Sequence, residues 1–417
     1  MKILRVIAVF VLLSAVCAWS AEALIRGLNA PIDSEQGEEQ SADMPLKKME
    51  YSVFATGKPC IHGVDISARS AVLCSADGLL LYERNADVPL PMASITKVMS
   101  AIIAIEKSED LKKEITVPDT AVGIEGSSVY LARGERVTLE MLLYSAMLES
   151  ANDAVTALAV AVCGSEEAFV AEMNEKAASL SMNSTSFRNP HGLSENDHFT
   201  TARDYARLMA YCLENEAFRI VIATKKAVFP KLDNSMTRVL SNHNRLLNTY
   251  SGILGGKTGF TRSSGRTLVT AAERNGTTLI CVTLDAPNDW NDHTLLFDKG
   301  FDTVKTVAFK AEDISTDITV GGGDREKLRL ISAYDTSYTV MKDDEVTYDI
   351  RLPHTVFAPV KKWDTVGKAV IYKNGERIAE IPLIATEAVR VPITVREEQG
   401  IFKRITNIIL NRSKATE

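Results

Sequence analysis

The sequence predicts an α/β protein of the α+β type, in which a domain with an antiparallel sheet flanked by helices precedes a small all-β domain. Two β-hairpins separated by a long block of helical periodicity predict the first domain, which we place at residues 58–305. Short runs of alternating polar and apolar residues predict the second domain at residues 306–395. With 417 residues, the chain has enough apolar content for both cores.

The sheet is predicted from five segments of β character. Residues 67–74 and 79–83 form one expected hairpin around an Asp-Gly turn, and residues 266–273 and 277–284 form another around an Asn-Gly turn. Residues 255–260 precede the second hairpin and contain three glycines, a composition typical of a strand that another backbone approaches closely. We therefore expect this segment to be an edge strand.

The helices are predicted from apolar periodicity and from capping residues. Thr138 and the Thr201-x-x-Asp204 pattern have the form of helix N-caps, and Gly164 has the form of a C-terminal glycine. The expected helices cover residues 98–105, 139–148, 153–163, 165–180, 205–213 and 291–304. The turn-rich segment 187–193 is expected to be a loop.

The first 23 residues have the form of a secretory signal peptide. Two basic residues precede an apolar run at residues 6–18, and Ala21-Glu22-Ala23 is a small-x-small cleavage pattern. An uncleaved membrane anchor is the alternative, although the run is short for a membrane span. Val16 disfavours a lipoprotein signal, because the residue before Cys17 would have to be small. We therefore expect an exported protein.

The two ends of the mature chain have different predicted roles. Residues 24–57 are polar and acidic and are expected to form a flexible linker. In residues 396–417, isoleucines and a phenylalanine fall on one helical arc and basic residues on the opposite arc. Such an amphipathic helix can lie in a membrane interface, which would place the protein at the outer face of the cytoplasmic membrane. Packing of this helix on the β domain, or against another helix, is the alternative.

Charge and cysteine usage exclude several classes of protein. The formal net charge is −7, which gives no indication of a nucleic-acid partner. The cysteines outside the signal peptide are five in number and widely spaced: Cys60, Cys74, Cys163, Cys212 and Cys281. We interpret them mostly as buried thiols, with a bridge between Cys60 and Cys74 as an open alternative. No metal-ligand spacing is present, so no metal and no other cofactor is predicted.

Ser94 is the candidate nucleophile. It stands at the start of the helix predicted at residues 98–105, where unsatisfied backbone N–H groups favour developing negative charge. Lys97 follows three residues later on the same helix face, so its amine can reach the Ser94 oxygen. A serine beside a base is an activated nucleophile. Taken alone, this spacing favours an N-cap serine followed by a solvated lysine.

Two further segments favour the interpretation of Ser94 as a nucleophile over that of a helix cap. Glu149-Ser150-Ala151-Asn152 lies at the joint between two predicted helices, where side chains can project into a cleft. Lys257-Thr258-Gly259-Phe260 lies on the predicted edge strand, which a substrate can extend by strand addition. Each segment alone has a structural explanation, as helix caps or as protection of a sheet edge. Their conjunction with Ser94 in this order indicates a catalytic site.

The set Ser-x-x-Lys, Ser-x-Asn and Lys-Thr-Gly resembles that of the serine D-alanyl-D-alanine carboxypeptidases, the low-molecular-mass penicillin-binding proteins. The likeness extends to Asn189-Pro190-His191-Gly192-Leu193 and to Thr200-Thr201-Ala202-Arg203-Asp204. The resemblance implies a β-lactamase/transpeptidase-like fold with the C-terminal β domain and amphipathic tail of that family. It also implies peptidoglycan stem peptides ending in D-Ala-D-Ala as substrates and β-lactams as ligands.

The resemblance assigns a role to each motif residue. Ser94 would attack the D-Ala-D-Ala carbonyl, Lys97 would act as base with a lowered pKa, and Ser150 would relay a proton to the departing alanine. Asn152 would hold the substrate amide, and Lys257 and Thr258 its terminal carboxylate. The backbone N–H groups of Ser94 and Phe260 would form the oxyanion hole. The implied substrate-binding residues are Asn152, Lys257, Thr258, Gly259 and Phe260.

One departure from the family concerns the carboxylate. Some members carry a carboxylate-binding arginine after the last two strands, but residues 286–293 contain none. Arg262 and Arg266 are the nearest candidates, and strand alternation decides whether either faces the site. His191 is expected to be structural, holding its own loop.

Three alternative functions are related to this one. A β-lactamase would need a glutamate on the loop after Ser-x-Asn, and residues 184–192 contain no acidic residue. A non-catalytic penicillin sensor would not need Lys97, Ser150 and Lys257 together. A DD-endopeptidase that cleaves cross-links remains an open alternative.

Overall fold

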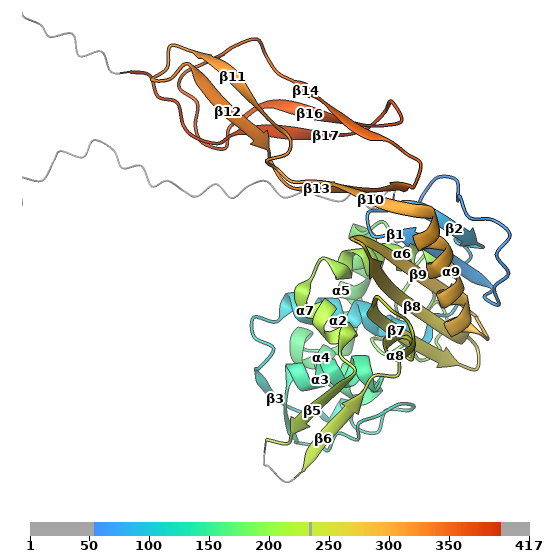
Figure 1. Ribbon diagram of the computed structural model, residues 1–417. Coiled ribbons are helices and arrows are strands. Elements are labelled where there is room, and N and C mark those ends of the chain that lie inside the picture. Colours follow the sequence, from blue (N-terminus) through green and yellow to red (C-terminus); the bar gives the residue numbers. More distant parts are fainter. Residues whose placement is uncertain (1–53, 233–235, 393–417) are drawn as a thin grey trace, which may run out of the picture. The chain divides into compact units, whose positions relative to one another are not determined.

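The computed structural model describes residues 54–232 and 236–392 (Figure 1). The predicted signal peptide (1–23), nearly all of the linker and the amphipathic segment 396–417 therefore lie outside the described residues. Phe54 and Ala55 are buried in the first core, so the linker prediction that runs to residue 57 extends too far.

The first domain is built on a five-stranded antiparallel sheet, which confirms the predicted fold class. Its strand order is β2-β1-β9-β8-β7. The strands are β1 (Ser70–Ser75), β2 (Leu80–Arg84), β7 (Ile253–Thr261), β8 (Gly265–Arg274) and β9 (Thr277–Leu284). Both expected hairpins are present, and β7 is the edge strand that its glycines predicted. The first strand begins three residues later than predicted, at Ser70.

Helices α6 (Ala202–Leu213) and α9 (Asp289–Thr303) pack on this sheet. The other described helices of the domain are α2 (Lys97–Lys107), α3 (Leu139–Leu148), α4 (Asn152–Cys163), α5 (Glu166–Ser179), α7 (Glu216–Ala223) and α8 (Leu246–Thr249). The hydroxyls of Thr138 and Thr201 accept the N–H groups of Met141 and Asp204, as N-caps do. Gly164 ends α4 in the left-handed region with φ of +83°.

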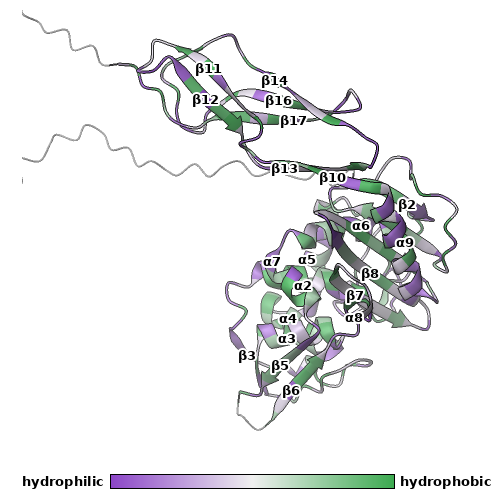
Figure 2. Ribbon diagram, viewed as in Figure 1, coloured by the Kyte–Doolittle hydropathy of each residue, from purple (hydrophilic) through white to green (hydrophobic). Residues whose placement is uncertain are grey.

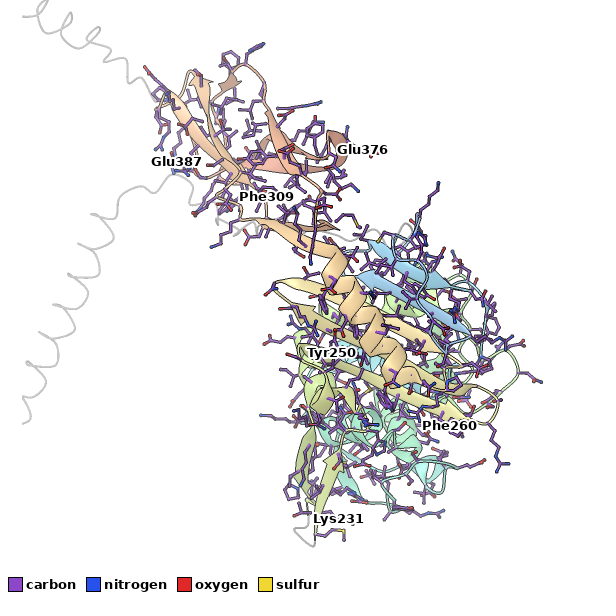
Figure 3. The ribbon with its side chains drawn as sticks, turned by 45° about the vertical axis from the view of Figure 1, so that its right-hand side comes forward. Lys231, Tyr250, Phe260, Phe309, Glu376 and Glu387 are labelled. Carbon is purple, nitrogen blue, oxygen red and sulfur yellow. The ribbon has the colours of Figure 1, made fainter. Side chains whose placement is uncertain are left out.

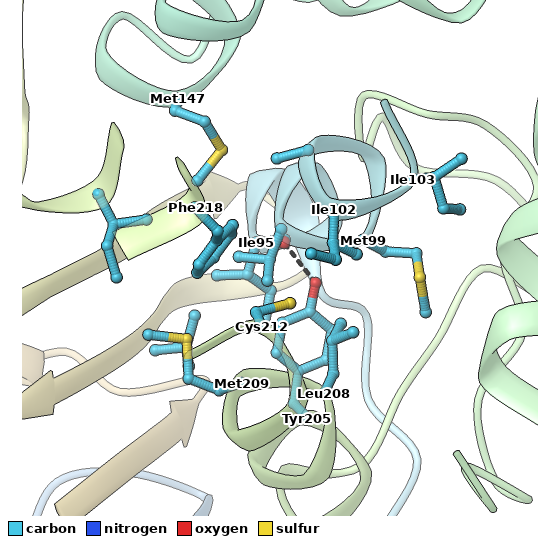
Figure 4. Packing of buried hydrophobic residues seen from close by; sticks show 14 of the residues in the cluster. Ile95, Met99, Ile102, Ile103, Met147, Tyr205, Leu208, Met209, Cys212 and Phe218 are labelled. Carbon is cyan, nitrogen blue, oxygen red and sulfur yellow. Dashed lines mark hydrogen bonds between the residues drawn. The ribbon is translucent and has the colours of Figure 1, made fainter. Parts of the chain in front are cut away.

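Alternation along the strands divides the apolar residues between two cores. Val269 and Ala271 of β8 face the core that contains α2 and α6. Leu268 and Ala272 face the core that contains Leu296 of α9, which lies across the other side of the sheet in Figure 1. Figure 4 shows the packing between α2 and α6, where the Tyr205 hydroxyl donates a hydrogen bond to the Ile95 carbonyl. This contact ties α6 to the turn that carries Ser94.

A buried histidine connects the sheet to α9. The His293 ring lies 2.7 Å from Thr270 Oγ1 through Nδ1 and 3.0 Å from Thr283 Oγ1 through Nε2. Burial disfavours the charged ring and lowers the pKa of His293 to about 3. The unfolded chain, in which the ring has a pKa near 6.5, therefore binds more protons than the folded chain between these two values.

This difference predicts acid destabilisation. The stabilising contribution of neutral His293 is complete above pH 6.5 and is lost as the pH falls towards 3, at about 1.4 kcal/mol per pH unit. The His293→Gln variant should lose that part of the slope in denaturant unfolding measured between pH 7 and 4. A His62→Gln variant, altered at an exposed position, should keep it. Equal slopes for the two variants would contradict the buried neutral ring.

The sequence did not predict α7 or the two small hairpins of this domain. These hairpins are β3 (Glu114–Thr116) with β4 (Arg136–Thr138), and β5 (Lys226–Pro230) with β6 (Thr237–Ser241). Arg238 of β6 contacts Glu135, whose side chain is 9% exposed, and this ion pair fixes the second hairpin beside α3.

The alternative of a disulfide is wrong. Cys60 and Cys74 are both free, as are the other three cysteines within the described part of the chain. The Cys60 thiol instead lies 3.7 Å from the Leu81 carbonyl. Cys74, Cys212 and Cys281 are buried thiols, as predicted.

An all-β domain follows α9, as predicted. A six-stranded sheet has the order β14-β16-β17-β12-β11-β15, and β10 pairs with β13. The strands are β10 (Val304–Phe309), β11 (Ser315–Gly321), β12 (Lys327–Ser332), β13 (Thr336–Met341), β14 (Val346–Arg351), β15 (Val356–Phe357), β16 (Thr365–Lys373) and β17 (Glu376–Ala385). Hydrophilic and hydrophobic residues mix along these strands in Figure 2, and the apolar ones form a core of their own. The predicted boundary at 305/306 falls inside β10.

No single described helix is long and apolar enough to cross a membrane. The bent pair α4 and α5 passes that test jointly, by length and composition alone.

Candidate active site

Ser94 lies in a 3-10 turn, Ala93–Thr96, just before the helix at whose start the sequence placed it. The turn leads directly into α2, and Ala93 adopts a φ of +51°. Two glycines enclose it. A Cβ on Gly192 would lie 2.0 Å from the Ala93 carbonyl oxygen, and a Cβ on Gly259 would lie 2.9 Å from the Ser94 nitrogen. The nucleophile is therefore held between the loop at Gly192 and strand β7.

Lys97 is fully buried and its amine has three partners. Nζ lies 2.6 Å from the His191 carbonyl oxygen, 2.7 Å from Asn152 Oδ1 and 3.1 Å from Ser94 Oγ. The first two partners can only accept hydrogen bonds. In its neutral form the amine has two hydrogens and one lone pair, so it would donate to both of them and turn its lone pair towards the Ser94 hydroxyl.

The surroundings favour that neutral form. Burial lowers the pKa of Lys97 well below its ordinary value, and the positive charge of Lys257 lowers it further. Asp153 acts in the opposite direction. The direction agrees with the sequence expectation of a lowered pKa for this lysine. A general base towards Ser94 would need this short contact and a lowered pKa.

Ser150 and Lys257 form a second pair beside the first. Lys257 Nζ lies 3.1 Å from Ser150 Oγ and 2.9 Å from the Thr258 carbonyl oxygen. Ser150 has a φ of +60°, a strained conformation that points its hydroxyl at the lysine from the joint of α3 and α4. Burial lowers the pKa of Lys257 to about 7.

Asn152 connects α4 to Lys97 and to a neighbouring loop. Its Nδ2 donates to the Glu125 carbonyl oxygen at 2.6 Å, and its backbone N–H donates to the Ser127 carbonyl oxygen at 2.7 Å. The loop is fastened by the buried Asp153 carboxylate, which accepts the Ser128 hydroxyl at 2.7 Å and the Leu131 N–H at 2.9 Å.

Asp153 is a site residue that sequence reasoning missed. The signal for it was its place directly after the Ser-x-Asn motif, in the first turn of a helix.

Strand β7 presents the Lys-Thr-Gly segment at the sheet edge. Lys257 pairs in register with Val269 of β8, Thr258 with Leu268 and Gly259 with Thr267. Phe260 is 65% exposed and lies near the end of β7 that leads into the turn before β8 (Figure 3). Within residues 54–232 and 236–392, β7 pairs with no strand on the side away from β8, so an extended ligand could add to this edge.

The loop around His191 supports the site through its backbone. Its carbonyl receives Lys97, while its Nδ1 accepts the Leu193 N–H at 3.2 Å. Burial, together with Lys97, lowers the pKa of His191 to about 3, so the ring is neutral. His198 links the same loop to the Ser94 turn, because its Nδ1 accepts the Arg188 N–H at 3.0 Å and Thr96 Oγ1 lies 2.9 Å from its Nε2.

The two candidate arginines for the substrate carboxylate have different surroundings. Arg262 lies exposed in the turn between β7 and β8. Arg266 donates from Nε to Asp289 at 3.0 Å and lies over the Trp290 ring at 5.5 Å from its centroid.

The described residues contain no cluster of three or more metal-ligating side chains.

Comparison with known proteins gives two family matches. Residues 53–288 match the family model described as D-alanyl-D-alanine carboxypeptidase, and residues 301–391 match the model described as penicillin-binding protein 5, C-terminal domain. The sequence is 30% identical over 332 residues to the D-alanyl-D-alanine carboxypeptidase DacF of Bacillus subtilis, covering 77% of this chain and 85% of that protein.

Other proteins show the same likeness. The D-alanyl-D-alanine carboxypeptidase DacC of Escherichia coli is 31% identical over 371 residues, covering 84% of this chain and 89% of that protein. Penicillin binding protein 5 of Haemophilus influenzae matches in structure with a TM-score of 0.66 and 26% identity, covering 79% of this chain and 99% of that one.

Proposed function

Because this chain belongs to the D-alanyl-D-alanine carboxypeptidase family, we propose that it removes the terminal D-alanine from peptidoglycan stem peptides through an acyl-enzyme on Ser94. The observation that carries this proposal is the hydrogen bonding of Lys97. Its amine is buried and bonded to two acceptors, which directs the lone pair at Ser94 Oγ.

Acylation begins with the transfer of the Ser94 hydroxyl proton to Lys97 Nζ. The Ser94 oxygen attacks the carbonyl carbon between the two D-alanines and forms a tetrahedral intermediate. As the C–N bond breaks, Ser150 passes a proton from Lys257 Nζ, which lies 3.1 Å away, to the leaving amine. D-alanine departs, and water then attacks the ester. The water proton returns through Ser150 to Lys257, and Lys97 returns its proton to the Ser94 oxygen, which restores both lysines and the Ser94 hydroxyl. Positioned proton transfer of this kind contributes about 10²–10⁴ in rate.

The oxyanion hole is assigned to the backbone N–H groups of Ser94 and Phe260. The close approach of Gly259 to the Ser94 nitrogen supports this assignment, because it brings β7 and the nucleophile turn together. Each such donor is worth about 10²–10³ in rate.

The substrate is assigned to the free edge of β7 as an added strand. Asn152 would bind a substrate carbonyl with its second Nδ2 hydrogen, because the first goes to the Glu125 carbonyl. Thr258 and Gly259 lie on the same strand, where the glycine leaves room for the substrate backbone. β-Lactams, which resemble the D-Ala-D-Ala amide, would acylate Ser94.

The test is release of free D-alanine from an acylated peptide ending in D-Ala-D-Ala, with the Ser94→Ala variant as control. The proposal expects release by the wild type alone. Acylation by penicillin without any turnover of the peptide would indicate a sensor. Rapid consumption of penicillin would indicate a β-lactamase, and cleavage restricted to cross-linked peptides an endopeptidase.

We further propose that the enzyme is exported and held at the outer face of the cytoplasmic membrane, in the cell wall or periplasmic space. The support is the signal-peptide pattern in residues 1–23 and the amphipathic pattern in residues 396–417. The likeness to a penicillin-binding protein agrees with an exported location.

Removal of residues 396–417 should release the enzyme from membranes. We expect the full chain to sediment with the membrane fraction and the shortened chain to stay in the supernatant, because the apolar arc that enters the interface is lost. Rates on a soluble peptide should be the same for both. Equal sedimentation of the two chains would contradict the proposed anchor.

A further inference from the structure

Lys257 is poorly suited to provide the main charge for a substrate carboxylate. Its side chain is 2% exposed, and Nζ already donates to Ser150 Oγ and to the Thr258 carbonyl. Burial lowers the pKa of Lys257 to about 7, so the amine is cationic in only part of the molecules at neutral pH. A carboxypeptidase, however, must recognise a free carboxylate.

The register of β7 and β8 places the Arg266 and Thr258 side chains on the same face of the sheet. Thr258 pairs with Leu268 and Phe260 pairs with Arg266, and directly paired residues of antiparallel strands point to the same face. Leu268 identifies this as the α9 face of the sheet. Arg266 is thus the diagonal neighbour of Thr258, at a separation of about 7–8 Å between backbones that a long side chain can bridge.

Two contacts orient the Arg266 guanidinium but leave most of its hydrogen-bond donors available. Its Nε donates to Asp289, whose side chain is 2% exposed, and the group lies over Trp290. The Arg266 side chain is 39% exposed, and across residues 54–232 and 236–392 only its Nε has a hydrogen-bond partner. Both terminal NH₂ groups therefore remain free to form the paired hydrogen bonds that a carboxylate accepts.

A cavity of ≈ 450 Å³ opens at this guanidinium, between α8 and the start of α9. Polar and cationic side chains line it, among them Arg245, Thr249, Arg266, Asn288 and Asn291. Asp289 is the one acidic residue in that lining and already contacts Arg266. The lining therefore favours an anionic group.

We propose that Arg266 binds the C-terminal carboxylate of the substrate and so determines the preference for a free carboxylate over an amide or a longer chain. This inference rests on the proposed carboxypeptidase function. Thr258 provides a hydroxyl on the same face, and Asp289 and Trp290 orient the guanidinium. A guanidinium keeps its charge at all physiological pH values, unlike the amine of Lys257.

The test compares two peptides that differ only in ending as D-Ala-D-Ala carboxylate or carboxamide. The Arg266→Gln variant should lower kcat/KM for the carboxylate peptide by about 10–100-fold, the effect of losing a charge-assisted hydrogen bond. Its kcat/KM for the amide peptide should equal that of the wild type. The Arg266→Lys variant should recover part of the preference, because it restores the charge without the paired geometry.

Arg274→Gln is the matched control. Arg274 also lies on β8, contacts Asp298 of α9 at 3.3 Å and lies over an aromatic ring, that of Tyr250, which Figure 3 shows beside α9. It stands at the opposite end of the strand, so its loss should leave the carboxylate preference intact.

Two results would overturn the inference. An equal fall for both peptides in Arg266→Gln would mean that the arginine only maintains the structure around Asp289. An unchanged ratio would assign the carboxylate to another group. If the wild type released no D-alanine at all, the proposed function itself would fail, and the inference with it.

Discussion

The Lys97→Met variant is expected to be acylated at Ser94 about 10²–10⁴-fold more slowly than the wild type. The change removes the proposed base while keeping the volume of the side chain. Lys97 is completely buried, and its amine is the group that contacts Ser94 Oγ. The rate is measured by stopped flow with a chromogenic or fluorescent β-lactam. In the wild type it should fall on acidification, since protonation of Lys97, with its lowered pKa, removes the lone pair.

Lys107→Met is the matched control for this experiment. Lys107 lies on the same helix but on its surface, paired with Glu172 at 2.6 Å. Its loss should leave acylation unchanged. Lys97→Met also leaves the Asn152 and His191 acceptors without their donor, at about 1–3 kcal/mol each, so thermal unfolding of the variant must be measured as well. Wild-type acylation by a folded Lys97→Met protein would exclude this lysine as the base.

Gly259→Ala is expected to lower acylation by about 10²–10³-fold, the loss of one oxyanion donor. A Cβ at this position would lie 2.4 Å from Thr267 Oγ1 and 2.9 Å from the Ser94 nitrogen. Strand β7 would have to move away from the nucleophile turn, and the Phe260 N–H would move with it. The measurement is the second-order rate of β-lactam acylation, with the folded state checked by circular dichroism.

Gly276→Ala separates this effect from a general cost of replacing glycine. Gly276 lies in the β8–β9 turn with a φ of +76°, and a Cβ there would meet no atom within 4 Å. This variant should be less stable, because alanine is strained at that φ, yet it should acylate at the wild-type rate. Equal acylation by Gly259→Ala and the wild type would mean that β7 does not hold the oxyanion donors against Ser94.

The elements that sequence reasoning predicted are those with strong local signals. The hairpins around Gly78 and Gly276 have turn residues that fix their registers, and the helices that begin after Thr138 and Thr201 have caps that the structure confirms. The three motifs of the site were found because their residue types and order are informative without knowledge of the fold.

What the sequence missed depends on tertiary contacts. Strands β5 and β6 alternate between exposed and partly buried residues, and their place is set by the distant Glu135. The Ser94 turn is 3-10 rather than a simple N-cap, since Gly192 and Gly259 press against it from remote segments.

One error and one open question have the same cause. Phe54 and Ala55 looked like linker because their burial comes from the folded domain and not from neighbouring residues. The face of Arg266 followed only from the register of β7 and β8, which residue spacing alone left open.

The most direct test of the account is the intact mass of the mature protein after incubation with a penicillin, beside the Ser94→Ala variant. We expect a lasting covalent adduct on the wild type and none on the variant. An adduct on Ser94→Ala would place the nucleophile elsewhere. No adduct on the wild type, with the penicillin unchanged, would mean that Lys97 does not activate Ser94.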